Sequence, residues 1–214
     1  MLEKLMNIDR RIIFVLVALS VIIPMMLKVS FPITVSDPTR NIYNFIDALP
    51  PRSVVMMAFD YGPSSLAELE PMAVAVLRHC FKKKIRVIGM TLLNVGATLG
   101  DETIRKVAEE MGAVNGEDYV FLGFRPGGVQ VLLGMGNLIS SVYETDYTKK
   151  PLSEIPMMAD IKNYEQINLV LDLASGSTPE VWVTYTNTRY NQQIAVGVTG
   201  VMVSQMYPYL QTKQ

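Results

Sequence analysis

An alternation of strand and helix patterns through the middle of the chain limits its fold more than any other feature. The runs 53–59, 85–92 and 119–124 are largely apolar and do not alternate with polar residues, which is typical of strands covered on both faces. Between these runs, apolar residues recur at helical spacing over 65–83 and 101–111. Because neighbouring parallel strands need a crossover between them, this order predicts right-handed strand-helix-strand units and a parallel sheet.

The C-terminal part continues this pattern less regularly. Residues 129–142 favour a helix although Gly134 and Gly136 lie within them, and 143–156 has the composition of a polar surface loop. Further patterns predict a short helix, three strands and a closing helix at 160–166, 167–173, 181–186, 194–198 and 200–210. We therefore predict one three-layer α/β/α domain, Rossmann-like or flavodoxin-like, with about five to six mostly parallel strands.

A run of sixteen residues without a charge, 12–27, precedes this domain and predicts a membrane anchor. At a rise of about 1.5 Å per residue it spans roughly 24 Å of a hydrocarbon core of about 30 Å, so its flanks must help to complete the span. No small residues follow it as in a cleaved signal peptide, and Arg10 and Arg11 at its start argue against a buried core helix. The expected lipid-facing residues are Ile12, Phe14, Leu16, Leu19, Ile23 and Leu27.

Basic residues around the anchor predict its orientation. Lys4, Arg10 and Arg11 precede the run and only Lys28 closely follows it, so the N-terminus should be cytoplasmic. We therefore expect a single-pass protein of the cell membrane whose domain is extracytoplasmic. The expected divisions are 1–29 for the cytoplasmic N-terminus and transmembrane anchor, 30–52 for a juxtamembrane tether and helix, and 53–214 for the α/β domain.

The composition argues against several classes of function. The 214 residues carry a net charge of −1 with bases and acids interspersed, so no basic stripe is present for nucleic acid. The single histidine, His79, and the single cysteine, Cys80, are adjacent on a predicted helix and point about 100° apart, which excludes a Cys-His dyad between them. The sequence lacks a phosphate-binding loop and a dinucleotide fingerprint. We expect no cofactor and no nucleic-acid partner.

Polar residues that follow the predicted strands mark a candidate site. In open α/β sheets, ligands bind in the crevice beyond the carboxyl ends of the strands. The alternative for each such residue is that its side chain only stabilises a turn. The candidate crevice residues are Asp60, Tyr61, Ser64, Ser65, Asn94, Arg125, Gly127, Gly128, Asp172, Ser175, Ser177, Asn187 and Arg189.

The first of these segments, Asp60-Tyr61-Gly62-Pro63-Ser64, resembles the metal-binding loop of von Willebrand factor A domains. In that family an aspartate and two hydroxyls at alternate positions hold Mg²⁺ after the first strand, and the resemblance implies such a site here. Gly62 stands in place of the first hydroxyl. The alternative is a strand-to-helix turn in which Asp60 and Ser65 bind backbone amides.

The anchor and the scarcity of catalytic motifs together favour one function. We expect a non-enzymatic, membrane-anchored α/β protein that acts as a structural or interaction subunit of a larger or self-associating membrane assembly. Its partners would be membrane lipid and either further copies of itself or other membrane subunits. The alternative is a membrane-tethered hydrolase, or a domain that binds a small molecule or metal in the crevice at the strand ends.

Overall fold

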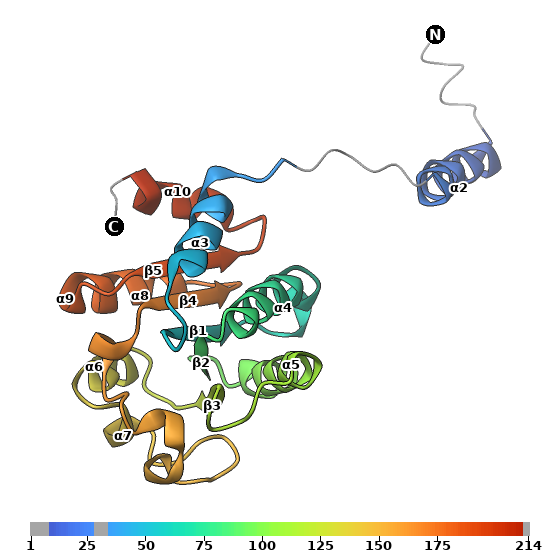
Figure 1. The fold of residues 1–214 in the computed structure, drawn as a ribbon. Helices are drawn as coiled ribbons and strands as arrows, with labels where there is room; N and C mark the ends of the chain where they lie inside the picture. Colours follow the sequence, from blue (N-terminus) through green and yellow to red (C-terminus); the bar gives the residue numbers. More distant parts are fainter. Residues whose placement is uncertain (1–8, 28–33, 212–214) are drawn as a thin grey trace. The chain divides into compact units, whose positions relative to one another are not determined.

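The computed structural model describes residues 9–27 and 34–211. It divides the chain into two compact units, Met1–Arg40 and Asn41–Gln214. The first unit contains helix α2 (Arg10–Met26), and the second contains the α/β domain (Figure 1).

Helix α2 covers 17 residues and contains the predicted apolar run as far as Met26. Asp9 caps the start of the helix by accepting a hydrogen bond from the Arg11 amide at 2.9 Å. Near its middle, Ser20 Oγ donates to the Val17 carbonyl at 2.7 Å, so this hydroxyl is satisfied within the helix. None of the residues of α2 is buried.

The predicted membrane-spanning helix is not confirmed. In the described ranges 9–27 and 34–211, no helix combines the length and the apolar character needed to cross a membrane. Leu27 already has an extended backbone, and Lys28 lies outside the described residues. Lys4, on which the predicted orientation depends, also lies outside them, so the orientation stays a prediction.

The described part of the domain contains a five-stranded, all-parallel sheet with the order β3-β2-β1-β4-β5 (Figure 1). This arrangement is an open, doubly wound α/β sheet, and its strand order is the one found in Rossmann-like sheets. The predicted parallel α/β fold is therefore confirmed. The strands are β1 (Val54–Asp60), β2 (Arg86–Thr91), β3 (Tyr119–Phe124), β4 (Leu169–Ala174) and β5 (Ile194–Val198).

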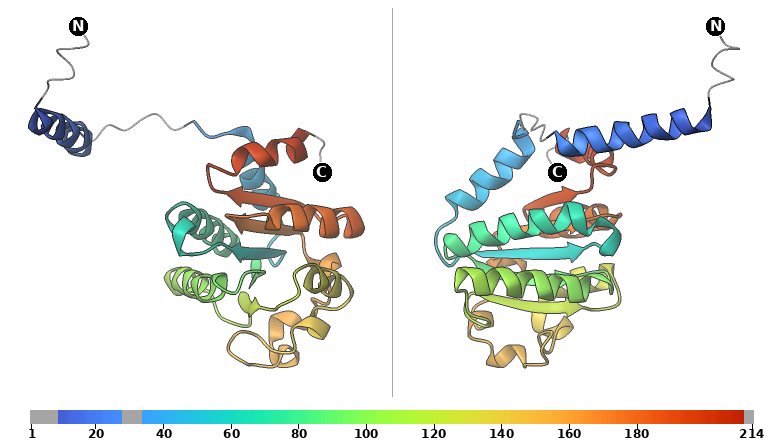
Figure 2. Two further views of the ribbon diagram at one scale, coloured as in Figure 1. Left: turned by 180° about the vertical axis from the view of Figure 1, so that it is seen from behind. Right: turned by 90° about the vertical axis from the view of Figure 1, so that its right-hand side faces the viewer.

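Helices α3 (Asp37–Ala48), α4 (Leu66–Lys82) and α5 (Gly96–Met111) supply the apolar residues that cover one face of the sheet. Figure 2 shows α4 and α5 running side by side along this face. Helix α5 begins five residues before the predicted start at residue 101, because Gly96 lets it approach β1 closely. A Cβ atom at Gly96 would collide with the carbonyl oxygen of Phe59.

The other face of the sheet is covered by short helices, which together make the third layer of the domain. Met56 and Ala58 of β1 point into this second core, whereas Met57 and Phe59 point into the first, as the two-residue repeat of a strand requires. The helical elements that follow β3 in the chain are α6 (Val129–Asn137), α7 (Ile139–Val142), the 3-10 turns Leu152–Glu154, Pro156–Met158 and Tyr164–Gln166, α8 (Thr178–Trp182), a π-helix (Val183–Asn187), α9 (Thr188–Tyr190) and α10 (Val203–Gln211).

The predicted strand at 181–186 is wrong, since this segment forms the end of α8 and most of the π-helix. Its β-branched residues favoured a strand. However, β4 and β5 are parallel neighbours, so the chain between them must cross over the sheet instead of pairing with it. Pro179 at the start of α8 is consistent with a helix N-terminus, and Trp182 and Thr186, four residues apart, both point inward.

The outer edge of β3 is closed by a hairpin formed by residues 145–151. The Tyr147 amide donates to the Phe121 carbonyl at 2.8 Å, and the Asp146 amide donates to the Lys150 carbonyl at 2.9 Å. The Tyr147 ring lies against Gly123, where a Cβ atom would be 2.6 Å from the ring. The predicted surface loop is therefore an ordered strap along the sheet edge.

Candidate functional site

The candidate site lies at the topological switch point between β1 and β4, where the connections after the two strands leave toward opposite faces. In the register of these strands, Asp172 is paired with Ala58, and Asp60 is paired with Ala174. Asp60 and Asp172 are therefore diagonal neighbours on one face of the sheet, and both are completely buried. Burial of two carboxyl groups at this position is unusual and calls for a physical explanation.

Two donors on the β2 side hold Asp60 in place. Its Oδ1 accepts a hydrogen bond from the Leu92 amide at 2.6 Å and another from the Thr91 hydroxyl at 3.0 Å. Burial raises the pKa of Asp60, while these two donors lower it. Because both donors stabilise a negative charge, Asp60 is the better placed of the two aspartates to be ionised.

Asp172 has no comparable hydrogen-bond donors that would stabilise a negative charge. Burial raises its pKa well above the ordinary value, and the negative charge of Asp60 raises it further. Neither carboxyl oxygen of Asp172 has a hydrogen-bond partner in the described protein, and the same holds for Asp60 Oδ2. We infer that the pair keeps one proton, which resides on Asp172, next to an ionised Asp60.

Further buried polar atoms surround this acid pair. Trp182 Nε1 approaches Asp60, and the Thr178 hydroxyl approaches Asp172, but neither contact reaches hydrogen-bond geometry. The Tyr143 hydroxyl is also unpaired, and the charge of Asp60 adds to burial in raising its pKa. Most buried polar groups in proteins are hydrogen-bonded, so a cluster of unpaired ones near a strand-end crevice marks a candidate binding site.

A cavity of about 310 Å³ opens beside this cluster, above the carboxyl ends of β2 and β3. The Arg125 guanidinium lines the cavity and lies over the Tyr143 ring, 5.8 Å from its centroid. Tyr143 therefore interacts both with the cavity's arginine and, through its hydroxyl, with the charge of Asp60. The polar and charged residues that line the cavity are Asn94, Thr98, Arg125, Thr145, Asp146, Tyr147 and Lys149.

The structure brings only some of the predicted crevice residues together. Asp60 and Asp172 form the acid pair, while Asn94 and Arg125 line the adjacent cavity. Asn187 and Arg189 do not follow a strand, because the strand predicted before them is helical, and Asn187 Nδ2 instead donates to the Gln192 carbonyl at 2.8 Å. The remaining candidates lie in the turns after β1, β3 and β4, and these are Tyr61, Ser64, Ser65, Gly127, Gly128, Ser175 and Ser177.

Sequence reasoning missed two aromatic members of the site. Tyr143 was predicted to lie in a surface loop, and Trp182 in a strand, yet both are fully buried beside the acid pair. A usable signal was present for Trp182, because Ser177-Thr178-Pro179-Glu180 has the residues of a helix N-terminus. No comparable signal was present for Tyr143, whose burial depends on the long-range path of the chain.

The segment that resembles a von Willebrand factor A metal loop makes turn contacts. Asp60 points into the protein, and Ser65 Oγ donates to the Gly62 carbonyl at 3.2 Å. Across residues 9–27 and 34–211, no three His, Cys, Asp or Glu side chains gather closely enough to hold a metal ion. These contacts match the alternative of an ordinary strand-to-helix turn.

His79 and Cys80 occupy structural positions on α4. The His79 ring stacks on Tyr43 of α3 with centroids 4.4 Å apart, and its Nε2 lies 3.3 Å from Asp47 Oδ1. Cys80 is buried, which raises the pKa of its thiol to about 12. A thiol with so high a pKa is protonated at neutral pH and is a poor nucleophile.

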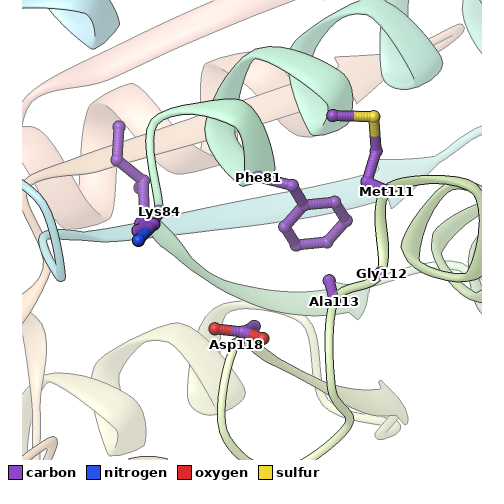
Figure 3. A pocket seen from close by; sticks show the side chains of 7 residues that line it. Phe81, Lys84, Met111, Gly112, Ala113 and Asp118 are labelled. Carbon is purple, nitrogen blue, oxygen red and sulfur yellow. The ribbon is translucent and has the colours of Figure 1, made fainter.

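A second cavity, of about 320 Å³, lies at the opposite end of the strands. Figure 3 shows Phe81, Met111 and Ala113 among its apolar lining residues and Lys84 and Asp118 as its charged ones. The cavity lies near the amino ends of β2 and β3, where ligand sites of open α/β sheets do not usually form. We therefore regard the carboxyl-end cluster as the stronger candidate.

In comparisons with protein-family models, with curated proteins and with solved structures, the chain shows no significant match. Doubly wound α/β folds carry many unrelated activities. The function must therefore be argued from the residues of this chain.

Proposed function

We propose that the protein is a membrane-anchored α/β module that serves as a structural or interaction subunit of a larger or self-associating membrane assembly. Helix α2 would be the element that inserts into lipid. The observation that carries the proposal is the exposure of α2, in which no residue is buried although most are large and apolar.

The apolar surface of α2 extends around its whole circumference. Successive residues such as Phe14, Val15 and Leu16 are 69%, 56% and 60% exposed, and steps of about 100° place them on different sides of the helix. A large aliphatic or aromatic side chain gains roughly 1.5–3 kcal/mol when it leaves water. A helix that is apolar on every side is stable only inside a protein core or in lipid.

The ends of α2 fit a membrane environment. Asp9, Arg10 and Arg11 gather the charges at its first turn, where they can remain in the headgroup layer. The 17 residues correspond to about 25 Å of helix, less than a hydrocarbon core of about 30 Å. The proposal therefore requires insertion of α2 into the membrane and does not depend on a complete crossing.

Vesicle flotation of the full chain tests the anchor. The unchanged protein should float with phospholipid vesicles, whereas Val17→Arg should lower the partition constant for the vesicles by roughly a hundredfold, because a central arginine costs about 2.5–3.5 kcal/mol in lipid. Val114→Arg is the matched control, since Val114 is 50% exposed and Val17 56%, but Val114 lies in the domain. Equal flotation of the two variants would contradict the anchor, and a strictly monomeric protein in mild detergent would contradict the assembly.

The cavity beside the acid pair favours a second function, the binding of a small anion. Arg125 and Lys149 line it, and neither forms an ion pair within the described residues. The one carboxylate in its lining, Asp146, already accepts hydrogen bonds from the Thr148 hydroxyl and the Lys150 amide. Two cations without an acidic partner, beside one satisfied acid, leave the cavity with a net positive charge.

Titration with inorganic phosphate and with citrate, followed by calorimetry, tests this second function. Arg125→Gln should weaken the binding of the anion by about tenfold or more, as expected for loss of a charge-assisted hydrogen bond. Arg189→Gln is the matched control, because Arg189 also lies 5.8 Å from a tyrosine ring but does not line the cavity. No heat of binding for either anion, or equal weakening in both variants, would exclude the function.

A further inference from the structure

The cavity beside the acid pair is built from three segments that lie far apart in the sequence. The end of β3 contributes residues within 122–125, the start of α5 contributes residues within 94–98, and the strap along β3 contributes residues within 145–149. Its volume of about 310 Å³ lies at the lower end of the range for small-molecule sites, which is about 300–1,000 Å³. A compact ligand therefore suits this cavity better than a long one.

Three features give the cavity a positive potential. Arg125 and Lys149 line it without an acidic partner among the described residues. Helix α5 begins at the cavity wall and its first turn contains no acidic residue, so the partial positive charge of this helix end is not compensated there. All three features favour an anionic group. A phosphate suits them well, because it offers enough oxygens to accept hydrogen bonds from an arginine and a lysine together.

A buried carboxylate in the same cavity restricts the rest of the ligand. Asp146 lines the cavity and is only 4% exposed. Its Oδ1 accepts hydrogen bonds from the Thr148 hydroxyl at 2.8 Å and the Lys150 amide at 2.9 Å, whereas its Oδ2 contacts only the same hydroxyl, at 3.0 Å. Since each carboxylate oxygen has two lone pairs, Oδ2 keeps the capacity to accept a ligand hydroxyl. A second anionic group beside Asp146 would be repelled, which disfavours a ligand that is charged along its whole length.

Uncharged polar side chains complete the lining. Asn94 and Thr98 at the start of α5 are exposed, and Thr145 lies at the start of the strap. The side chains of these three residues form no hydrogen bond to any other part of the chain that the structure describes. Amide and hydroxyl groups offer both donors and acceptors, and so do the hydroxyls of a sugar. The cavity thus provides partners for several ligand hydroxyls next to its two cations.

We propose that the cavity binds a phosphate monoester whose body carries hydroxyl groups, such as a sugar phosphate. This inference rests on the second proposed function, the binding of a small anion. Arg125 and Lys149 bind the phosphate. Asp146, Asn94 and Thr98 hydrogen-bond the hydroxyls of the body. Inorganic phosphate makes only the first of these two sets of contacts, so it binds more weakly than the ester.

Calorimetry on the full chain in mild detergent tests the inference with two matched ligands. Ribose 5-phosphate and pentyl phosphate share the anionic group and the length of the carbon chain, but only ribose 5-phosphate carries hydroxyls. Ribose 5-phosphate should bind about tenfold more tightly or better, because its hydroxyls form hydrogen bonds that an alkyl chain cannot form. Thr98→Val keeps the shape of the side chain, and it should weaken the binding of ribose 5-phosphate about fivefold without changing that of pentyl phosphate.

Thr184→Val is the matched control, because Thr184 is also an exposed threonine in a helical segment but does not line the cavity. It should not change the affinity for either ligand. If pentyl phosphate bound as tightly as ribose 5-phosphate, or if both threonine variants weakened ribose 5-phosphate equally, the inference would be overturned, while binding of inorganic phosphate that depends on Arg125 would still support the anion site. If inorganic phosphate and both esters failed to bind, the second proposed function would be refuted as well.

Discussion

Replacing Asp60 with alanine is expected to lower the free energy of unfolding by about 2 kcal/mol, because the Leu92 amide would lose its acceptor. An unpaired buried donor such as this amide costs roughly 1–3 kcal/mol. The Thr91 hydroxyl, which also contacts Asp60 Oδ1, can turn to the Leu93 carbonyl at 3.0 Å. Asp60→Asn keeps an oxygen at this position and should be less damaging. Urea denaturation at neutral pH measures both changes.

Asp172 should behave differently from Asp60, since we infer that it is already neutral. Asp172→Asn preserves a neutral, proton-donating group of the same shape, so at neutral pH it should change the free energy of unfolding by less than about 1 kcal/mol. Equal destabilisation by Asp60→Asn and Asp172→Asn would contradict the assignment of the proton to Asp172.

The same pair should make stability depend on pH. The pKa of Asp172 is raised in the folded state above its ordinary value of 3.8, so between those two values the folded protein binds more protons than the unfolded chain. Stability should therefore fall as the pH rises from about 4 toward the raised pKa. Asp172→Asn should reduce this decline to the contribution of Asp60, whose pKa burial also raises, and unfolding curves over that pH range would show it. Parallel pH profiles for the two proteins would refute the inferred protonation.

Trp182→Ala is expected to be the second strongly destabilising change, with a loss of about 3–5 kcal/mol. Trp182 is fully buried in the core on the side of α6 and α8, and its removal would leave a large cavity next to two carboxyl groups. Trp182→Phe retains most of the apolar volume and should cost less than about 2 kcal/mol. Urea denaturation measures the difference from the transition midpoints, provided that the free energy of unfolding keeps the same dependence on urea concentration in both variants.

Comparison of the two Trp182 variants separates the contribution of packing from that of the indole N–H group. If alanine and phenylalanine were equally harmful, the contribution of Trp182 would come mainly from its Nε1–H group near Asp60 and not from packing. A small effect of both changes would contradict the burial of Trp182 in the second core.

The sheet could be predicted because its strands have an unambiguous composition. The runs at 53–59 and 119–124 lie within a residue of β1 and β3, since strands buried on both faces need apolar residues at nearly every position. The segment 181–186 could not be assigned in this way, because its β-branched residues pack as a helix when a crossover requires one. The early start of α5 depends on the contact between Gly96 and Phe59, which is invisible in local sequence.

The candidate site was only partly predictable, for a related reason. Asp60 and Asp172 were predicted to lie at strand ends, and the parallel order of the strands places both at one edge. Their mutual burial depends on β1 and β4 being neighbours, which follows from the strand order and not from either strand alone. Tyr143 is buried near Asp60, although it comes from a segment whose polar sequence resembles that of a loop.

In the membrane assembly that we propose, the strap along β3 would have a consequence for crowding. Confinement to a surface raises the local concentration of identical chains, and an open strand edge would then invite one sheet to extend into the next. Here the Tyr147 amide occupies the Phe121 carbonyl, and the tyrosine ring fills the space above Gly123. The strap should therefore allow many copies to crowd together while suppressing growth into fibrils through this edge.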